Sequence, residues 1–351
     1  GLEIPDRWWE DADLDTSNNK NNNILQSGNS PDFYDLRREN PENRNSEFIN
    51  VLPDIRNQGG CGSCWAFATV GALEFNIARE ENQEVDLSEQ WLISCNNDGW
   101  GCGGGWWAHS YYEWKKGKCG GKGAVLDSDF PNQYSDDINW KDWADSNDEF
   151  RHYYLINEWH YIGLSVYPYG VPSISDIKQY MLNYGPICAS IYAGDEFHDY
   201  NGGLFDENEV PDDWPGQEWL DPTNHAILLV GWDDDYQGTG TGVWILRNSW
   251  GTGWGDDGYM YIKYGTSKVG YAANYINYAG LGSGDNTVEF KIKELTNDPS
   301  KGDYETIEGV GHSPEPDWFY KIWLEDDNGK TYSRHNRNSE YFTGIENFID
   351  E

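Results

Sequence analysis

Residues 58–67 read QGGCGSCWAF and contain the clearest chemical signal in this 351-residue chain. Directly after Cys64, apolar side chains recur at helical spacing, at Ala66, Val70, Leu73 and Ile77. We therefore expect Cys64 at the start of a helix, where unpaired backbone N–H groups lower the pKa of a thiol and make it a nucleophile. Gln58 can donate a side-chain N–H to a developing oxyanion, together with the backbone N–H of Cys64.

Two later segments predict the base that this thiol needs. His225 opens the apolar run 225–230, HAILLV, so packing at the start of a strand is expected to hold its ring. Asn248 follows the apolar run 243–246 and can accept a hydrogen bond from the imidazole, which fixes the tautomer of the ring. Trp250 can shield that hydrogen bond from water. The pattern indicates a Cys–His pair that is oriented by an amide.

Five segments, in this order, resemble the papain-like cysteine peptidases, and the resemblance covers about residues 33 to 280. They are 58–67, 87–90 (LSEQ), 101–105 (GCGGG), 224–226 (NHA) and 248–255 (NSWGTGWG). The resemblance implies an α+β fold with two lobes, a helical lobe over about residues 60–130 and a β-barrel-like lobe over about residues 150–265. It also implies a secreted endopeptidase that forms a thioester with its substrate.

The resemblance also implies a role for each matching residue. Cys64 is similar to the family's nucleophile and His225 to its general acid and base. Asn248 matches the orienting residue and Gln58 the oxyanion donor. The positions implied to bind the substrate are Gly104, Gly105, Trp107, Ser190, Thr223, Asn224 and Trp250. Trp107 stands where the family has a smaller residue, which argues against a large hydrophobic pocket.

The chain has six cysteines, and the residues alone leave three pairings open for any four of them. The resemblance implies two disulfides, Cys61–Cys102 and Cys95–Cys119, and a buried free thiol at Cys188. A zinc site would need a second closely spaced pair to match Cys61 and Cys64, and none follows. We expect neither a metal nor a cofactor.

Charge restricts the partners of this chain. Lys and Arg total 24 against 61 Asp and Glu, which gives a formal net charge of −37. A surface this anionic repels phosphate backbones, so the partners expected are proteins or peptides and not nucleic acid. No run of apolar residues is long enough to predict a membrane span. Disulfides fit a secreted, extracellular or cell-surface protein.

Two flanking segments differ in composition and residue pattern from the predicted peptidase domain, residues 33–282. Residues 1–32 are polar and rich in Asn, and we expect a tail or the remnant of a prosegment. Residues 283–351 predict an accessory, β-sandwich-like module, because 287–292 alternates as a half-buried strand and 326–329 reads as a hairpin turn. Its Asp-rich loops favour calcium or a surface ligand, and its few strands indicate a truncated module.

Two classes of function compete at this point. The alternative to an active peptidase is a catalytically silent binding protein that keeps the fold, and it predicts the loss of at least one of Cys64, His225 and Asn248. All three are present, which favours the enzyme. Insertions near residues 136–157 and 208–221 account for the long separation of His225 from Cys64, and they can reshape the rim of the cleft.

Overall fold

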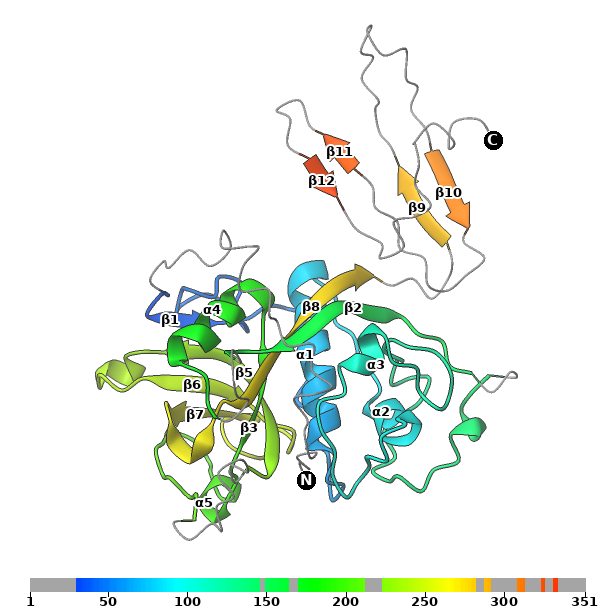
Figure 1. The fold of residues 1–351 in the computed structure, drawn as a ribbon. Helices are drawn as coiled ribbons and strands as arrows, with labels where there is room; N and C mark the ends of the chain where they lie inside the picture. Colours follow the sequence, from blue (N-terminus) through cyan, green and yellow to red (C-terminus); the bar gives the residue numbers. More distant parts are fainter. Residues whose placement is uncertain are drawn as a thin grey trace, which may run out of the picture. The chain divides into compact units, whose positions relative to one another are not determined.

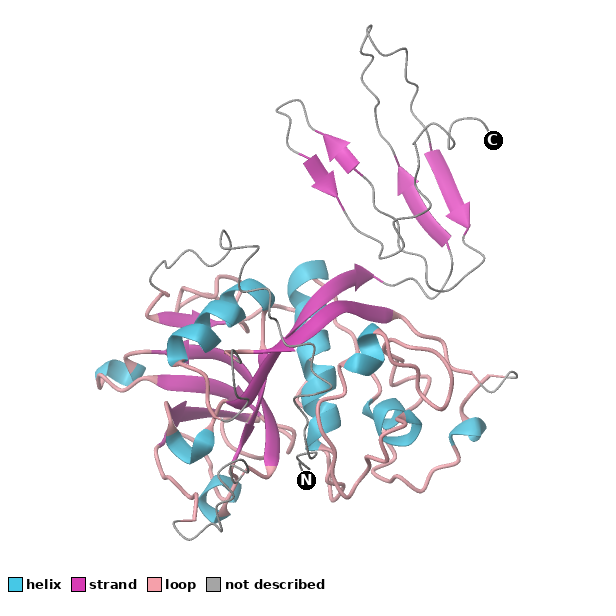
Figure 2. Cartoon of the chain, in the orientation of Figure 1, coloured by secondary structure: helices cyan, strands magenta, loops and turns pink. Residues whose placement is uncertain are grey.

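The computed structural model describes residues 30–145, 149–163, 170–211 and 223–281, together with four short strands beyond them. The chain divides into two compact units, Gly1–Leu281 and Gly282–Glu351. The first unit is a mixed α+β structure with one large sheet and few helices (Figures 1 and 2), which confirms the expected fold class.

The helices of the first unit are short except for α1. They are α1 (Cys64–Glu81), α2 (Glu89–Cys95), α3 (Ser110–Glu113), α4 (Ile174–Tyr184) and α5 (Asp195–His198). Three short 3₁₀ turns lie at Trp140–Asp142, Tyr236–Gly238 and Thr266–Lys268.

α1 is the central element of this unit. Every residue from Cys64 to Ala78 is buried, because the helix packs against β3, β5 and β8 and also against α2 (Figure 1). Gly71 permits the close approach of Arg247, since a Cβ at this position would lie 2.5 Å from its Nη1. The helix ends at Asn82, which adopts the left-handed conformation with φ 51°.

The sheet runs in the order β2-β8-β3-β5-β6-β7-β4, and β1 pairs with β5. All of its pairs are antiparallel except β4 with β7. The strands are β1 (Phe33–Asp35), β2 (Tyr154–Tyr161), β3 (Ile187–Ile191), β4 (Leu204–Phe205), β5 (His225–Asp233), β6 (Val243–Arg247), β7 (Tyr259–Lys263) and β8 (Tyr271–Leu281). The sheet thus includes β1, which precedes the range of about 150–265 that the resemblance implied for the β lobe. It also includes β8, which follows that range.

The register of β5 and β6 brings two residues of the candidate site together. β5 begins at His225 and is buried along its whole length, as its apolar sequence predicts. Leu228 faces Arg247, the last residue of β6, so the residues that follow β6 lie beside the beginning of β5. Two antiparallel neighbours therefore bring His225 and Asn248 to the same edge of the sheet, although 23 residues separate them.

The first unit contains two disulfides, Cys61–Cys102 and Cys95–Cys119, which are the pairs that the resemblance implied. The Cys61–Cys102 bond ties the segment before α1 to the glycine-rich segment 101–105. Cys188 and Cys64 are free and buried. The Cys188 Sγ donates to the carbonyl oxygen of Ala68 at 3.2 Å, and burial raises the pKa of this thiol.

Four strands are described in the second unit. β9 (Thr287–Lys291) pairs with β10 (Glu308–His312), and β11 (Trp323–Glu325) pairs with β12 (Thr331–Ser333), both antiparallel. β9 and the β11–β12 pair occur where the sequence predicts a strand and a hairpin. The loops expected to bind calcium or a surface ligand lie outside the described residues, as does the tail over residues 1–29.

We expect Gly71→Ala to lower the stability of the fold. In an ordinary helix the change would gain about 1 kcal/mol. Here the added methyl group would meet the buried guanidinium of Arg247, and overpacking of this kind costs about 1–3 kcal/mol. Thermal unfolding should therefore shift to a lower temperature. Gly253→Ala is the control, because a Cβ there meets nothing within 4 Å. A more stable Gly71→Ala protein would contradict the close packing.

Candidate active site

Cys64 is the first residue of α1, as the sequence predicts, and its side chain is fully buried. Burial is the largest influence on the thiol and raises its pKa. Backbone hydrogen bonds from Ala226, Trp65 and Cys64 itself act in the opposite direction and favour the thiolate. The net direction is upward, so the expectation from the helix N-terminus alone is wrong for this buried thiol. The influence of Ala226 indicates that the sulfur lies near the residue that follows His225.

His225 is 5% exposed and is held by Asn248. Its Nε2 lies 2.7 Å from Asn248 Oδ1. Because this oxygen can only accept, Nε2 carries the hydrogen, and Nδ1 remains as the nitrogen that can take a proton. Burial lowers the pKa of His225 to about 4, although the bond to Asn248 raises it. The sequence predicts that Asn248 accepts a hydrogen bond from the imidazole, and the structure places Asn248 Oδ1 at this distance from the ring.

Aromatic rings cover the hydrogen bond between His225 and Asn248. The ring centroids of Trp250 and His225 are 4.7 Å apart, as expected for a shielding indole. Phe197 meets both of these rings edge-on. The exposed ring of His198 stacks on Trp250 at 4.5 Å, with an interplanar angle of 10°. Nothing in the sequence pattern around α5 pointed to His198.

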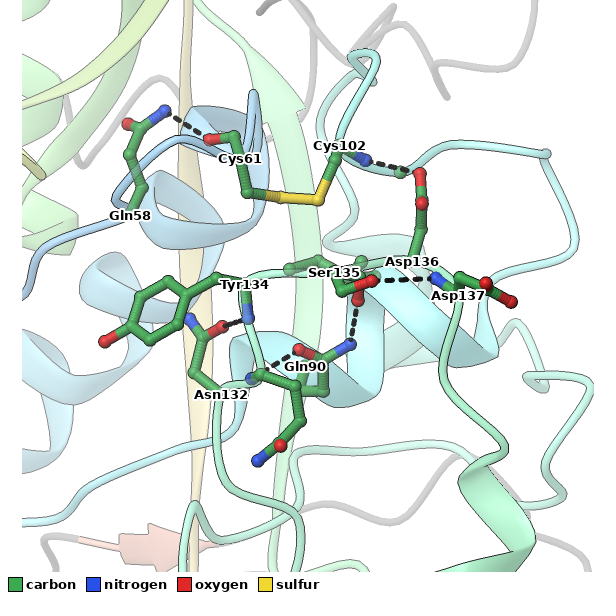
Figure 3. Close-up of a disulfide and its surroundings, with 12 residues drawn as sticks. Gln58, Cys61, Gln90, Cys102, Asn132, Tyr134, Ser135, Asp136 and Asp137 are labelled. Carbon is green, nitrogen blue, oxygen red and sulfur yellow. Dashed lines mark hydrogen bonds between the residues drawn. A yellow bond between two sulfur atoms is a disulfide. The ribbon is translucent and has the colours of Figure 1, made fainter.

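Gln58 and Ser249 link the two sides of the site. Gln58 Oε1 accepts a hydrogen bond from Ser249 Oγ at 2.7 Å, and Ser249 N donates to Asn248 Oδ1 at 2.8 Å. Gln58 Nε2 donates to the carbonyl oxygen of Cys61 at 2.9 Å (Figure 3). This nitrogen carries two hydrogens, so one N–H is left for a substrate. The amide is thereby fixed in orientation by neighbours on both of its ends.

The glycine-rich segment packs directly on the residue after Cys64. Gly104 and Gly101 exchange two backbone hydrogen bonds, which close a tight turn with φ 145° at Gly104. A Cβ at Gly105 would lie 2.6 Å from the Trp65 ring, so only glycine fits there. Trp65 Nε1 also donates to the carbonyl oxygen of Gly101 at 3.2 Å. The segment expected to bind the substrate is therefore positioned by the start of α1.

The remaining predicted substrate residues lie mostly in the interior. Ser190 Oγ donates to the carbonyl oxygen of Tyr271 at 3.1 Å and lies 3.2 Å from Thr223 Oγ1. The side chain of Asn224 makes two hydrogen bonds with the backbone of Ala193. Trp107 is 2% exposed. Their role in binding a substrate stays a prediction.

A group of four charged residues, three of them buried, was missed by the sequence reasoning. Glu74 and Glu89 lie with Arg56 and Arg247 around a cavity of about 20 Å³, large enough for one water molecule. Asn248 and Ser249 also line the cavity. Glu74 is the one acidic residue within the buried stretch of α1, and this was the available signal. Such a carboxylate needs partners, and Leu87 N donates to its Oε1 at 3.0 Å.

A family model described as "Papain family cysteine protease" matches residues 38–279, more than half of the chain. The chain belongs to the papain family of cysteine proteases. All four residues of the predicted catalytic set lie within the matched range. Within the described residues, no helix is long and apolar enough to cross a membrane, and no group of three or more His, Cys, Asp or Glu could hold a metal ion.

Individual members of the papain family are similar over most of this chain. A viral cathepsin of Adoxophyes honmai nucleopolyhedrovirus is 31% identical over 71% of the chain and 64% of its own length. Human cathepsin O is 31% identical over 63% of the chain and 61% of its own length. The solved structure of digestive procathepsin L 3 from the larval midgut of Tenebrio molitor is 25% identical, with a TM-score of 0.52, over 72% of this chain and 71% of that one. The chain spans 54–64% of the length of four curated relatives.

The buried Glu74 makes a prediction about stability and pH. Burial raises its pKa from 4.5 to about 7, although the charge of Arg247 lowers it. The folded state then binds more protons than the unfolded state between these values, so stability falls as pH rises from about 4.5 to 7. The loss is on the order of 3 kcal/mol, at about 1.4 kcal/mol per pKa unit.

Glu74→Gln removes this titration and keeps an oxygen for Leu87 N. We expect the melting temperature of the variant to fall less than that of the unchanged protein between pH 4.5 and 7. Glu84→Gln, at an exposed position, is the control and should leave the pH dependence unaltered. Parallel curves for Glu74→Gln and the unchanged protein would show that this carboxyl titrates normally.

Proposed function

We propose that this chain is a secreted cysteine endopeptidase that hydrolyses peptide bonds of protein substrates with Cys64 and His225. One observation carries the proposal. The backbone of Ala226 lowers the pKa of the Cys64 thiol, while the neighbouring His225 is bonded through Nε2 to Asn248 and keeps Nδ1 for a proton. Membership of the papain family supports the same chemistry. A silent binding protein would not need this arrangement.

The reaction begins with a proton transfer from the Cys64 thiol to Nδ1 of His225. Burial disfavours a charge on either group alone. The transfer, however, creates a thiolate and an imidazolium side by side, and their attraction in a site of low dielectric opposes the cost of burial. The backbone N–H groups that reach the sulfur add to this stabilisation.

The thiolate then attacks the carbonyl carbon of the scissile bond, and the carbonyl oxygen becomes an oxyanion. The free N–H of Gln58 Nε2 and the backbone N–H of Cys64 stabilise this charge. His225 donates its proton to the leaving amine, and a thioester remains on Cys64. His225 next takes a proton from water, the hydroxide attacks the thioester, and the acid product leaves as the thiol is restored.

Secretion is supported by the two disulfides, because such bonds persist in oxidising compartments. The net charge of −37 suits an extracellular medium, where it maintains solubility. Within the site, Gly104, Gly105 and Trp107 are proposed to contact the substrate on the side of the helical lobe. Ser190, Thr223, Asn224 and Trp250 are proposed to do so on the side of the β lobe.

An epoxide peptide directed at thiols tests the proposal. It should label one site per molecule, at Cys64, and lose this reactivity in His225→Ala at neutral pH. Peptide hydrolysis should fall by about 10⁴-fold or more in Cys64→Ala. Cys188→Ala, which removes the other free thiol, should keep both labelling and activity. Hydrolysis that persists in Cys64→Ala would reject the thiol mechanism.

Gln58→Ala should lower kcat about 10²–10³-fold with little change in KM, since the amide stabilises charge that exists only in the transition state. The variant also removes the partner of Ser249 Oγ. Ser249→Ala breaks the same hydrogen bond but leaves the donor in place, so its kcat should fall far less. Equal losses in the two variants would mean that Gln58 serves only to position its neighbours.

A further inference from the structure

Residues 131–137 form a loop beside segment 58–61, which is named here the oxyanion-hole segment (Figure 3). The buried side chain of Gln90 in α2 holds the loop on both sides of Tyr134. Its Oε1 accepts from Gln133 N at 2.8 Å, and its Nε2 donates to the carbonyl oxygen of Ser135 at 2.7 Å. The position of this loop is therefore set by the helical lobe.

A second attachment joins the loop to the glycine-rich segment. Asp136 Oδ2 accepts from Cys102 N at 2.9 Å. Cys102 is bonded to Cys61, whose carbonyl oxygen accepts from Gln58 Nε2 (Figure 3). The loop is thus hydrogen-bonded to Cys102, and the disulfide of Cys102 links it to the segment that carries Gln58 in the proposed mechanism.

Tyr134 places an exposed aromatic ring next to Gly59 in the oxyanion-hole segment. Its Cδ1 lies 3.3 Å from the position of a Cβ at Gly59, the residue after Gln58. The side chain is 54% exposed, and Figure 3 shows it on the side of Gln58 and turned away from Asp136. Its backbone has φ 56°, which is unfavourable for a residue with a bulky side chain. The attachments at Gln90 hold the ring in this place against that preference.

The stretch of sequence on both sides of Tyr134 is acidic, which favours a cationic partner for its ring. Residues 127–145 contain six Asp and one Lys, a net charge of −5. An aromatic face attracts a cation through its quadrupole, and a negative potential raises the local concentration of cations. A neutral apolar side chain would gain only from the ring. An arginine or lysine gains from the ring and from the potential.

We propose that Tyr134 is a specificity-determining residue that binds an arginine or lysine side chain of the substrate next to the scissile bond. The inference rests on the proposed peptidase function and adds a substrate class to it. Tyr134 takes no part in the chemistry. It contributes to the binding of a cationic residue through the face of its ring.

The test compares peptides that carry arginine with peptides that carry citrulline, which has nearly the same shape and no charge. The residues on both sides of the scissile bond are varied in turn. The unchanged enzyme should have a higher kcat/KM for arginine at one of these positions. Tyr134→Gly, which removes the ring and suits the positive φ, should reduce this preference about two- to fivefold.

Two further variants separate the ring from other effects. Tyr134→Phe retains the aromatic face and should keep the preference for arginine. Trp114→Ala removes an aromatic ring of similar exposure at the end of α3 and should also keep it. Epoxide labelling of Cys64 counts the active sites of each preparation. An equal loss for arginine and citrulline peptides, or no loss in Tyr134→Gly, would overturn the inference.

Binding measured without turnover keeps this inference distinct from the proposed function. In a Cys64→Ala background, the dissociation constants of the same arginine and citrulline peptides report the ring–cation contact directly. Failure of the unchanged protein to cleave any peptide would reject the peptidase. The loss of the arginine preference on Tyr134→Gly in the inactive background would still support the site, and an unchanged preference would reject it.

Discussion

The beginning of α1 packs against the beginning of β5, and this contact places every group of the proposed catalytic centre. Because residues 64–78 of α1 are buried on all sides, the helix has no freedom to shift relative to the sheet. The backbone of Ala226, in β5, consequently influences the pKa of the Cys64 thiol. The same helix carries Trp65, whose ring leaves room only for glycine at position 105. The position of α1 thus sets the positions of the thiol, of the imidazole and of the backbone that is proposed to bind the substrate.

Buried charges lie immediately behind this contact. Glu74 lies in α1, the helix that begins with Cys64, and Arg247 is the last residue of β6, directly before Asn248. Both residues line the same small cavity. The charge of Arg247 lowers the pKa of Glu74, so the two groups attract each other when Glu74 is ionised. The Arg247 guanidinium also fills the space that Gly71 leaves open and donates to the carbonyl oxygen of Asp54. Helix and sheet are therefore joined by electrostatics as well as by apolar packing.

The loop around Tyr134 shows how an acidic surface can take part in the function of such a site. A net charge of −37 weakens contact with anionic molecules everywhere on the protein. Near the oxyanion-hole segment, however, an acidic stretch of sequence carries an exposed aromatic ring that is held in a fixed and unfavourable backbone conformation. Charge supplies attraction at long range and the ring supplies contact at short range. The loop's attachments to Gln90 and Cys102 keep the two together.

The five motifs and their order in the sequence were enough to predict the family, the α+β fold and the start of α1. Each of these predictions depends on short stretches of sequence that can be recognised without the structure. The residues also indicated that Asn248 would orient His225, and the described hydrogen bond joins them. The upward direction of the pKa of Cys64 was not predictable, since burial comes from strands more than a hundred residues away along the chain. The cavity around Glu74 and the loop that carries Tyr134 were equally hidden, because side chains distant in the chain meet there. Local sequence determined which groups are present, and tertiary packing decided how each is solvated and what it faces.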